Sequence, residues 1–366
     1  MSGKVARAGR LERSARSADA TVEYGPLQTG DRRLLDELCG RVLDAPGRVL
    51  ELRRWLERHP VAGLARRNVV ARCGGRLVGA MTVVPIEVRG GGQSLKAAWQ
   101  QDSAVDPEFR RRGIATGLMD AAAAGLDLVM VKGTSRAMAE ARRAAGFVDV
   151  TPSDFLVRVL RPRGMPLPGF QAAGFLLSRL RSRTAVADDP EVRRDESLDE
   201  RFDALDTGRT DQPVLAVRRS AALLQARYRE LPGRDYRILT LAGHNRVRGA
   251  VVLRPPPRPG GVAWLVDLIR SQADSGVEDR LVGAAVREAH ALEAGLLATF
   301  ASDRRARKAL ARWGFLRTHR SPRFLVRTQN ERAARLVGEF GFDVWHGDGD
   351  LEMSEEMEET QCKARG

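Results

Sequence analysis

A short segment in the first third of the chain combines a turn, a glycine and three consecutive arginines. It runs from Asp102 to Met119, and Pro107 separates a strand-like stretch from a helix that begins near Gly113. The first backbone N–H groups of a helix have no partner inside the helix, and the helix dipole favours an anion at that end. Because Gly113 has no Cβ, the backbone there can come close to a phosphate. The segment therefore predicts a phosphate-binding turn at Arg110–Ala115.

The three arginines of this turn support the prediction only together with their neighbours. Cations at a helix N-terminus oppose the helix dipole, and a bound diphosphate would relieve that conflict. The chain holds 61 Lys and Arg residues, however, nearly all of them Arg, so a run of three is expected about once by chance. The order of strand, proline, arginine, glycine and alanine is the more specific signal. No GxxxxGK[ST] loop is present, which excludes a P-loop NTPase.

The stretch Arg110-Arg111-Arg112-Gly113-Ile114-Ala115 resembles the Q/R-x-x-G-x-G/A signature of the GNAT N-acetyltransferase superfamily. Val105–Phe109 resembles its usual lead-in, and the resemblance covers about residues 21–160. It implies that acetyl-CoA lies between the strand ending at Val105 and the strand at Leu126–Val131, with its pyrophosphate on the amides of the turn. The cofactor-binding residues that the resemblance implies are Ala104, Val105, Arg110, Arg111, Arg112, Gly113, Ile114, Ala115 and Thr116.

The resemblance also implies direct attack of a substrate amine on the thioester. A backbone N–H near Val105 is the natural donor to the developing oxyanion. Asp102 is the candidate base that takes the amine proton, although an aspartate at this place also fits a surface or turn-capping role. Many members of the superfamily carry Asn at the start of the last helix and Tyr seven residues later. Here Ser135 and Arg142 stand at those places, so water or Ser135 would serve as the acid.

The elements around the turn predict an α/β layered domain. Strand-like runs flank Gly74-Gly75 and Gly90–Gly92, which predicts hairpins. Helices are expected at 32–43, at 50–57, from Gly113 onward and at 135–145, and strands at 126–131 and 155–160.

Two stretches of the second half repeat patterns of the first. Arg246–Leu253 matches Arg76–Val83 at an offset of 170, and Arg304–Phe315 matches Arg136–Phe147 at an offset of 168. The expected fold class is α/β, with two tandem GNAT-like domains, each a mixed, mostly antiparallel sheet flanked by helices. In the second copy, acids follow Gly276 and would repel a pyrophosphate. The expected organisation is a basic tail at 1–20, an acyltransferase domain at 21–162, a linker with an amphipathic segment at 163–197, a degenerate copy at 198–352 and an acidic tail at 353–366.

Charge and composition bound the function further. The net charge is +14, but the basic residues are spread along the chain among 47 acids, so nucleic-acid binding is not expected. No apolar run approaches the ~20 residues of a membrane span, and the N-terminus lacks the apolar core of a secretory signal. The amphipathic segment fits docking on a neighbouring domain, or a membrane surface. The acidic stretch from Asp348 to Glu359 is expected to be solvated.

Three scattered cysteines and five scattered histidines give no metal-ligand spacing, and a reducing cytoplasm is the expected compartment. The predicted function is N-acyltransfer from acetyl-CoA to a small-molecule amine or amino sugar. Two alternatives remain open: a CoA-binding regulatory module without catalysis, and a basic nucleic-acid-binding protein.

Overall fold

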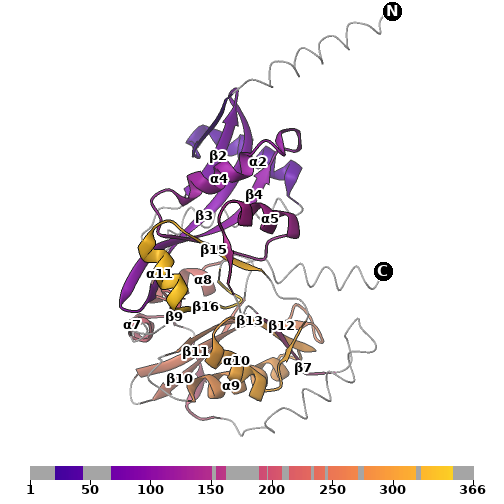
Figure 1. The fold of residues 1–366 in the computed structure, drawn as a ribbon. Helices are drawn as coiled ribbons and strands as arrows, with labels where there is room; N and C mark the ends of the chain where they lie inside the picture. Colours follow the sequence, from indigo (N-terminus) through magenta and orange to yellow (C-terminus); the bar gives the residue numbers. More distant parts are fainter. Residues whose placement is uncertain are drawn as a thin grey trace, which may run out of the picture. The chain divides into compact units, whose positions relative to one another are not determined.

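Part of the chain is described by the structure, a computed structural model. It describes residues 21–43, 67–150, 154–161, 189–195, 197–207, 214–231, 235–243, 246–270, 276–318 and 323–348 (Figure 1). The chain forms two compact units: the first comprises residues 1–60, 65–85 and 99–125, and the second comprises residues 61–64, 86–98 and 126–366. The expected tails at 1–20 and 353–366 and the expected helix at 50–57 lie outside the described residues.

The first unit is built on successive antiparallel strands. Its strands are β1 (Val22–Pro26), β2 (Arg67–Cys73) and the adjoining parts of β3 (Arg76–Gly90) and β4 (Gln93–Val105), which both continue into the second unit. β2 pairs antiparallel with both β1 and β3. The predicted Gly-Gly turn between β2 and β3 is confirmed, because Gly74 and Gly75 adopt φ of 56° and 75°. Glycine takes these left-handed angles at no steric cost, as a tight hairpin requires.

Two helices pack on these strands. α2 (Arg32–Val42) follows the short 3-10 turn η1 (Thr29–Asp31), and α4 (Ile114–Ala123) follows η3 (Pro107–Phe109). The core under α2 consists of Leu35, Leu38, Cys39, Val70, Leu77, Ala80 and Ala104. α4 lies against β3 at Gly79, where a Cβ would be 3.0 Å from both Ile114 and Leu118. The absence of a side chain at Gly79 thus lets the helix approach the strand closely.

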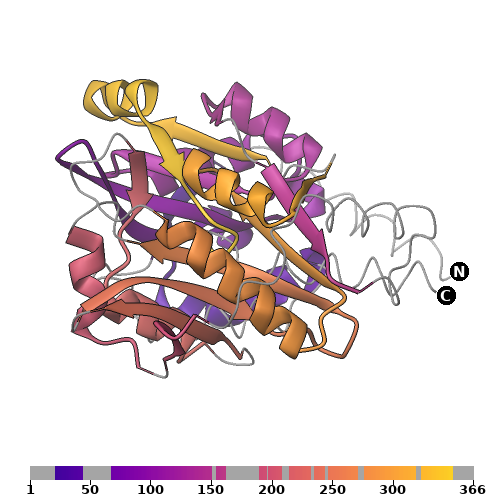
Figure 2. The ribbon, with the colours of Figure 1, turned by 90° about the horizontal axis from the view of Figure 1, so that it is seen from below.

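The second unit contains the remaining elements. They are β5 (Leu128–Lys132), α5 (Arg136–Ala144), β6 (Val148–Asp149), β7 (Asp154–Val159), β8 (Val192–Arg194), η4 (Glu200–Phe202), α7 (Asp203–Thr207), β9 (Val214–Val217), α8 (Ala221–Tyr228), β10 (Arg237–Gly243), β11 (Arg246–Arg254), β12 (Val262–Arg270), α9 (Val277–Ala291), β13 (Leu296–Ala301), α10 (Arg304–Arg312), β14 (Leu316–Arg317), β15 (Phe324–Thr328), α11 (Glu331–Glu339) and β16 (Gly341–Asp343). Seven of the described strands form one sheet in the order β14-β7-β13-β12-β11-β10-β8. Helices α9 and α10 pack side by side, with α9 on β10, β11 and β12 (Figure 2). The other described strands belong to a second, nine-stranded sheet. Two mixed sheets flanked by helices confirm the expected fold class.

The two halves of the sequence exchange one strand each. β7, from the first half, pairs antiparallel with β13 and β14 in the seven-stranded sheet. β15, from the second half, pairs antiparallel with β5 and β6. The strand expected at 155–160 is therefore present, but it joins the sheet of the other half. The expected linker at 163–197 also contributes β8, which pairs with β10, and Val192 packs on the core of that sheet.

The sequence repeat has a structural counterpart in each half. Gly249 lies in β11 as Gly79 lies in β3, and its Cβ would be 2.8 Å from Val277 and 2.9 Å from Leu281, the first and fifth residues of α9. Helices α5 and α10 both have nine residues, and each is followed by a left-handed glycine. The same local packing therefore occurs in both halves. None of the helices among the described residues is long and apolar enough to cross a membrane.

Candidate functional site

The predicted phosphate-binding turn lies entirely in the first unit, between β4 and α4. Arg110 is extended, with φ of −65° and ψ of 158°, whereas Arg111 and Gly113 are left-handed, with φ of 63° and 75°. Gly113 is the N-cap of α4, and a Cβ built on it would meet no atom within 4 Å. A left-handed conformation costs an ordinary residue about 1 kcal/mol or more. Gly113 is therefore suited to the backbone conformation, and the space beside it is open.

The first turn of α4 presents unbonded amides. The Gly117 N–H donates to the Gly113 carbonyl at 3.0 Å, which closes the first helical turn. Among the described residues, none accepts a hydrogen bond from the amides of Ile114, Ala115 or Thr116, and the N-cap has no side chain that could do so. Such amides, together with the helix dipole, form an anion-binding end.

Asp106 holds the start of the turn. Its carboxylate, 4% exposed, accepts hydrogen bonds from Arg41 Nη2 at 3.0 Å and Arg76 Nη2 at 2.8 Å. It also accepts from the amide of Glu108, while its own amide donates to the Val78 carbonyl at 2.9 Å. Burial opposes the charge of Arg76, but its bonds to Asp106 and Glu108 outweigh burial and raise the pKa of Arg76. The role of Asp106 was not predicted from the sequence, although Asp followed by Pro and Glu is a helix-start signal.

Two arginines of the turn contact neighbouring groups: Arg112 lies over the ring of Phe109, and Arg110 donates to a backbone carbonyl. Phe109 is buried, and the guanidinium carbons of Arg76 and Arg112 lie 5.2 and 5.1 Å from its ring centroid. Arg110 Nε donates to the Val105 carbonyl at 3.3 Å. Within the part of the chain that the structure describes, Arg111 and Arg112 form no ion pair. Their positive charge is thus held near the open amides without an acid that neutralises it.

The end of β4 carries the other predicted residues of this unit. Ala104 is fully buried in the cluster under α2, and Val105 is the half-buried last residue of the strand. Asp102 has φ of 46°, a left-handed angle inside a strand. Such an angle is uncommon for a residue other than glycine, and it occurs disproportionately at functional sites. The structure therefore marks Asp102 as a position of irregular backbone within β4, which no sequence pattern indicated.

Ser135 belongs to the second unit. Its hydroxyl caps α5 by accepting a hydrogen bond from the Met138 amide at 3.3 Å, as serine commonly does at an N-cap. Seven residues on, Arg142 is 4% exposed, and burial lowers the pKa of its guanidinium to about 10. None of the described carboxylates forms an ion pair with Arg142. No pattern in the sequence indicated that this arginine would be buried.

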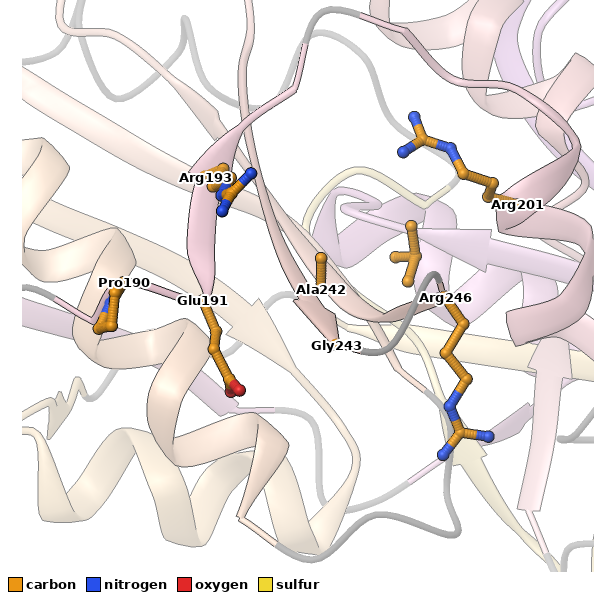
Figure 3. A pocket seen from close by; sticks show the side chains of 8 residues that line it. Pro190, Glu191, Arg193, Arg201, Ala242, Gly243 and Arg246 are labelled. Carbon is orange, nitrogen blue, oxygen red and sulfur yellow. The ribbon is translucent and has the colours of Figure 1, made fainter.

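The second unit also has a basic cavity of about 570 Å³ (Figure 3). It is lined by Pro190, Glu191, Arg193, Arg201, Ala242, Gly243, Arg246 and Val247. Arg201 is bonded to Asp199 at 2.7 Å and to Asp195 at 3.1 Å, whereas Arg193 and Arg246 are exposed. None of the residues predicted for the site lines this cavity. Over the described ranges, no group of three His, Cys, Asp or Glu side chains could hold a metal ion.

Comparison with known proteins gives one matching domain model and a set of similar folds. Residues 34–128 match the model of an acetyltransferase (GNAT) domain, and the match contains most of α2 and all of β4, the turn and α4. A search of curated proteins found no match.

Three solved structures illustrate the similarity in fold. A GCN5-related N-acetyltransferase from Anabaena variabilis ATCC 29413 aligns with a TM-score of 0.60 at 12% identity, over 86% of this chain and 74% of that one. A probable N-acyltransferase from Enterococcus faecalis V583 aligns with a TM-score of 0.57 at 12% identity, over 84% and 73%. A GCN5-related N-acetyltransferase from Kribbella flavida aligns with a TM-score of 0.55 at 14% identity, over 87% and 74%. The chain thus has the fold of GCN5-related N-acetyltransferases, and its residues 34–128 match the GNAT domain.

Proposed function

We propose that the chain is an N-acyltransferase that moves an acetyl group from acetyl-CoA to an amine, and that the turn at Arg110–Ala115 binds the pyrophosphate of the donor. The observation that carries this proposal is the open N-terminus of α4, where three amides that find no acceptor among the described residues lie next to a left-handed glycine. The positive charges of Arg111 and Arg112, which pair with no acid in the described part of the chain, add attraction for an anion. The GNAT match of residues 34–128 supports acyl transfer as the reaction class.

Each residue then has a distinct task. The amides of Ile114, Ala115 and Thr116 hold the pyrophosphate, and the backbone of β4 near Ala104 and Val105 pairs with the pantetheine. When bound, acetyl-CoA supplies the thioester carbonyl that the amine attacks. Peptide N–H groups near the end of β4 donate to the oxygen on which negative charge develops.

Proton transfer completes the reaction. A bond forms between the amine nitrogen and the acetyl carbon, and the bond from that carbon to sulfur breaks. Asp102 accepts the proton that the amine loses, directly or through water. Water or Ser135 returns a proton to the sulfur. Ser135 Oγ already accepts a hydrogen bond as the cap of α5, so its own O–H remains able to donate.

Binding is tested first, by titration calorimetry with acetyl-CoA. The informative variant is Ala115→Glu, because an acid in the first turn of a helix is favourable for the helix but would repel a diphosphate. Ala334→Glu, an exposed position near the start of α11, makes the same change elsewhere and serves as control. We expect at least ~10-fold weaker binding for Ala115→Glu alone. Equal affinity of both variants and the wild type would remove the basis of the proposal.

Catalysis is tested next, by release of free thiol from acetyl-CoA with a panel of amines. We propose a small-molecule amine or an amino sugar as the acceptor, so both belong in the panel. Binding without thiol release for any amine would favour the alternative, a regulatory module that binds CoA. Salt-dependent binding of DNA without binding of acetyl-CoA would contradict both.

A further inference from the structure

The second half contains a counterpart of the opening in which the donor is expected. β12 corresponds to β4, and α9 corresponds to α4, because α9 also begins at a left-handed glycine, Gly276, with φ of 84°. β12 and β13 pair in parallel only from Val262 to Trp264. Beyond Trp264 the backbone register ends, and only the Thr299 hydroxyl still donates to the Leu265 carbonyl, at 2.7 Å. β12 continues to Arg270 beside β11, and β13 continues to Ala301 beside β7. The two strands therefore part, as the strands of an acyl-CoA opening would.

The protein's own chain lies in this opening. We call residues Val344–Asp348, which follow β16, the C-terminal strap. On one side, the Ser302 amide donates to the Val344 carbonyl at 3.1 Å, and Trp345 forms a β-bridge with Ala301, the last residue of β13. On the other side, the Gly347 amide donates to the Val266 carbonyl of β12 at 2.7 Å. The strap thus bonds to both strands beyond the point where they stop pairing.

The strap is tightly packed. A Cβ on Gly347 would be 2.6 Å from Val266 and 2.9 Å from the hydroxyl of Tyr228, so only glycine fits. His346 stacks on Trp264, with ring centroids 4.3 Å apart. These contacts leave no space for a second occupant at this place.

A buried ion pair fixes the end of the strap. Asp348 opens the acidic stretch that was expected to be solvated, and this expectation is wrong for Asp348, which is 1% exposed. Its carboxylate accepts from Arg219 at 2.7 Å and from the Trp345 amide at 2.8 Å. Burial alone would raise the pKa of Asp348, but nearby cations, Arg219 first, lower it. The carboxylate is therefore ionised and paired, as a buried charge must be.

A second set of ion pairs closes the helix end of the opening. Arg270, the last residue of β12, is 1% exposed and forms ion pairs with Glu278 at 3.0 Å and with Asp303 at 2.8 Å. Glu278 is the second residue of α9, and Asp303 is the N-cap of α10. Arg270 thus joins the two helix starts, and the acid in α9 occupies the end that would have to receive a phosphate.

The first half lacks all three charges at the corresponding positions. The last residue of β4 is Val105, the second residue of α4 is Ala115, and the N-cap of α5 is Ser135. None of these uncharged side chains can form the ion pairs of the second half. At the helix end of the opening, the difference between the halves therefore lies in these three side chains.

We propose that the second opening is permanently filled by the protein itself, by the C-terminal strap between the strands and by Arg270 at the helix end, so that the chain has one acyl-CoA site. The inference of one acyl-CoA site per chain rests on the proposed function, whereas the inference that the protein's own chain fills the second opening does not. The strap replaces the donor as the structural filling of the second half.

On the full-length protein, calorimetry tests the number of acetyl-CoA sites, and hydrogen exchange tests whether the strap stays in the second opening. We expect one acetyl-CoA per chain, and slow exchange of the strap amides that saturating acetyl-CoA does not change. Two acetyl-CoA per chain, or faster exchange of the strap on binding, would overturn the proposal. If acetyl-CoA does not bind at all, the proposed function fails, while slow exchange of the strap would still support the filled opening.

A variant tests what holds the strap. Asp348→Asn removes the charge that pairs with Arg219, so the strap amides should exchange roughly tenfold faster or more. Binding should remain at one acetyl-CoA per chain, because Arg270 still closes the helix end. Asp189→Asn, which loses an ion pair with Arg280 elsewhere in the unit, is the control and should leave strap exchange unchanged. Unchanged exchange in Asp348→Asn would contradict the role of the ion pair. If that variant does not fold, the wild-type measurement decides alone.

Discussion

Two glycines in the same structural position allow the phosphate role of the turn to be separated from its conformational role. Gly113 and Gly276 are the N-caps of α4 and α9, with φ of 75° and 84°, and a Cβ on either would meet no atom within 4 Å. Alanine at either position therefore introduces no clash, only the cost of a left-handed L-residue, about 1 kcal/mol. We expect Gly113→Ala and Gly276→Ala to lower the free energy of unfolding by this same amount, measured by chemical denaturation.

The two variants should differ in binding. In Gly113→Ala the new methyl group stands in the open space beside the amides of α4, where the pyrophosphate would approach. Loss of one hydrogen bond to a charged group costs about 1.5–3 kcal/mol, so the Kd of acetyl-CoA should rise roughly tenfold to a hundredfold. Gly276→Ala should bind as the wild type does. Equally weakened acetyl-CoA binding in both variants would mean that the effect comes from lower global stability. Unchanged binding in Gly113→Ala would refute the close approach of the backbone to a phosphate.

Three further predictions concern charged side chains. Asp106→Asn should lower the free energy of unfolding by ~1–2 kcal/mol and weaken acetyl-CoA binding, because the carboxylate that pairs with Arg41 and Arg76 at the start of the turn loses its charge. Chemical denaturation and calorimetry measure the two effects, and unchanged binding would contradict the prediction. Arg142→Leu should leave the unfolding free energy unchanged or raise it by ~1 kcal/mol, because it removes a buried cation that has no carboxylate partner among the described residues. A clear loss of stability would show that the guanidinium has a stabilising partner. Burial alone would raise the pKa of Glu87, but hydrogen bonds from Arg89 and Arg218 lower it from 4.5 to about 2. The ionised Glu87 carboxylate therefore contributes its full stability above pH 4.5, and this contribution is lost as the pH falls toward 2. Glu87→Gln should be less stable than the wild type by ~1 kcal/mol at pH 6 and equally stable near pH 2, measured by chemical denaturation. A stability difference that does not depend on pH would refute the pairing.

Local signals in the sequence were sufficient for the turn and its helices. Paired glycines fix a tight hairpin through backbone angles that other residues avoid, and the strand, proline, glycine and apolar stripe around Gly113 act within a few residues of each other. Their placement is confirmed by β2, β3, β4 and α4. The same holds for α5, where Ser135 supplies the N-cap and Gly146 the left-handed stop.

Other features depend on contacts between distant parts of the sequence. An apolar strand such as Phe155–Val159 has the same pattern whichever buried sheet it joins, so its choice of partner cannot be read from its residues. Asp348 was misjudged because acids are normally solvated, and its partner Arg219 lies 129 residues away. The left-handed angle of Asp102 is likewise imposed by its surroundings and not by its residue type.

The exchanged strands β7 and β15 have a consequence for any attempt to separate the halves. A fragment that ends before β8 would carry β7 without the strands that flank it and would leave the place between β5 and β6 vacant. Each piece would thus expose unpaired strand edges, which favour aggregation. A single proteolytic nick between β7 and β8 should instead give two polypeptides that elute together in size-exclusion chromatography and separate only in denaturant.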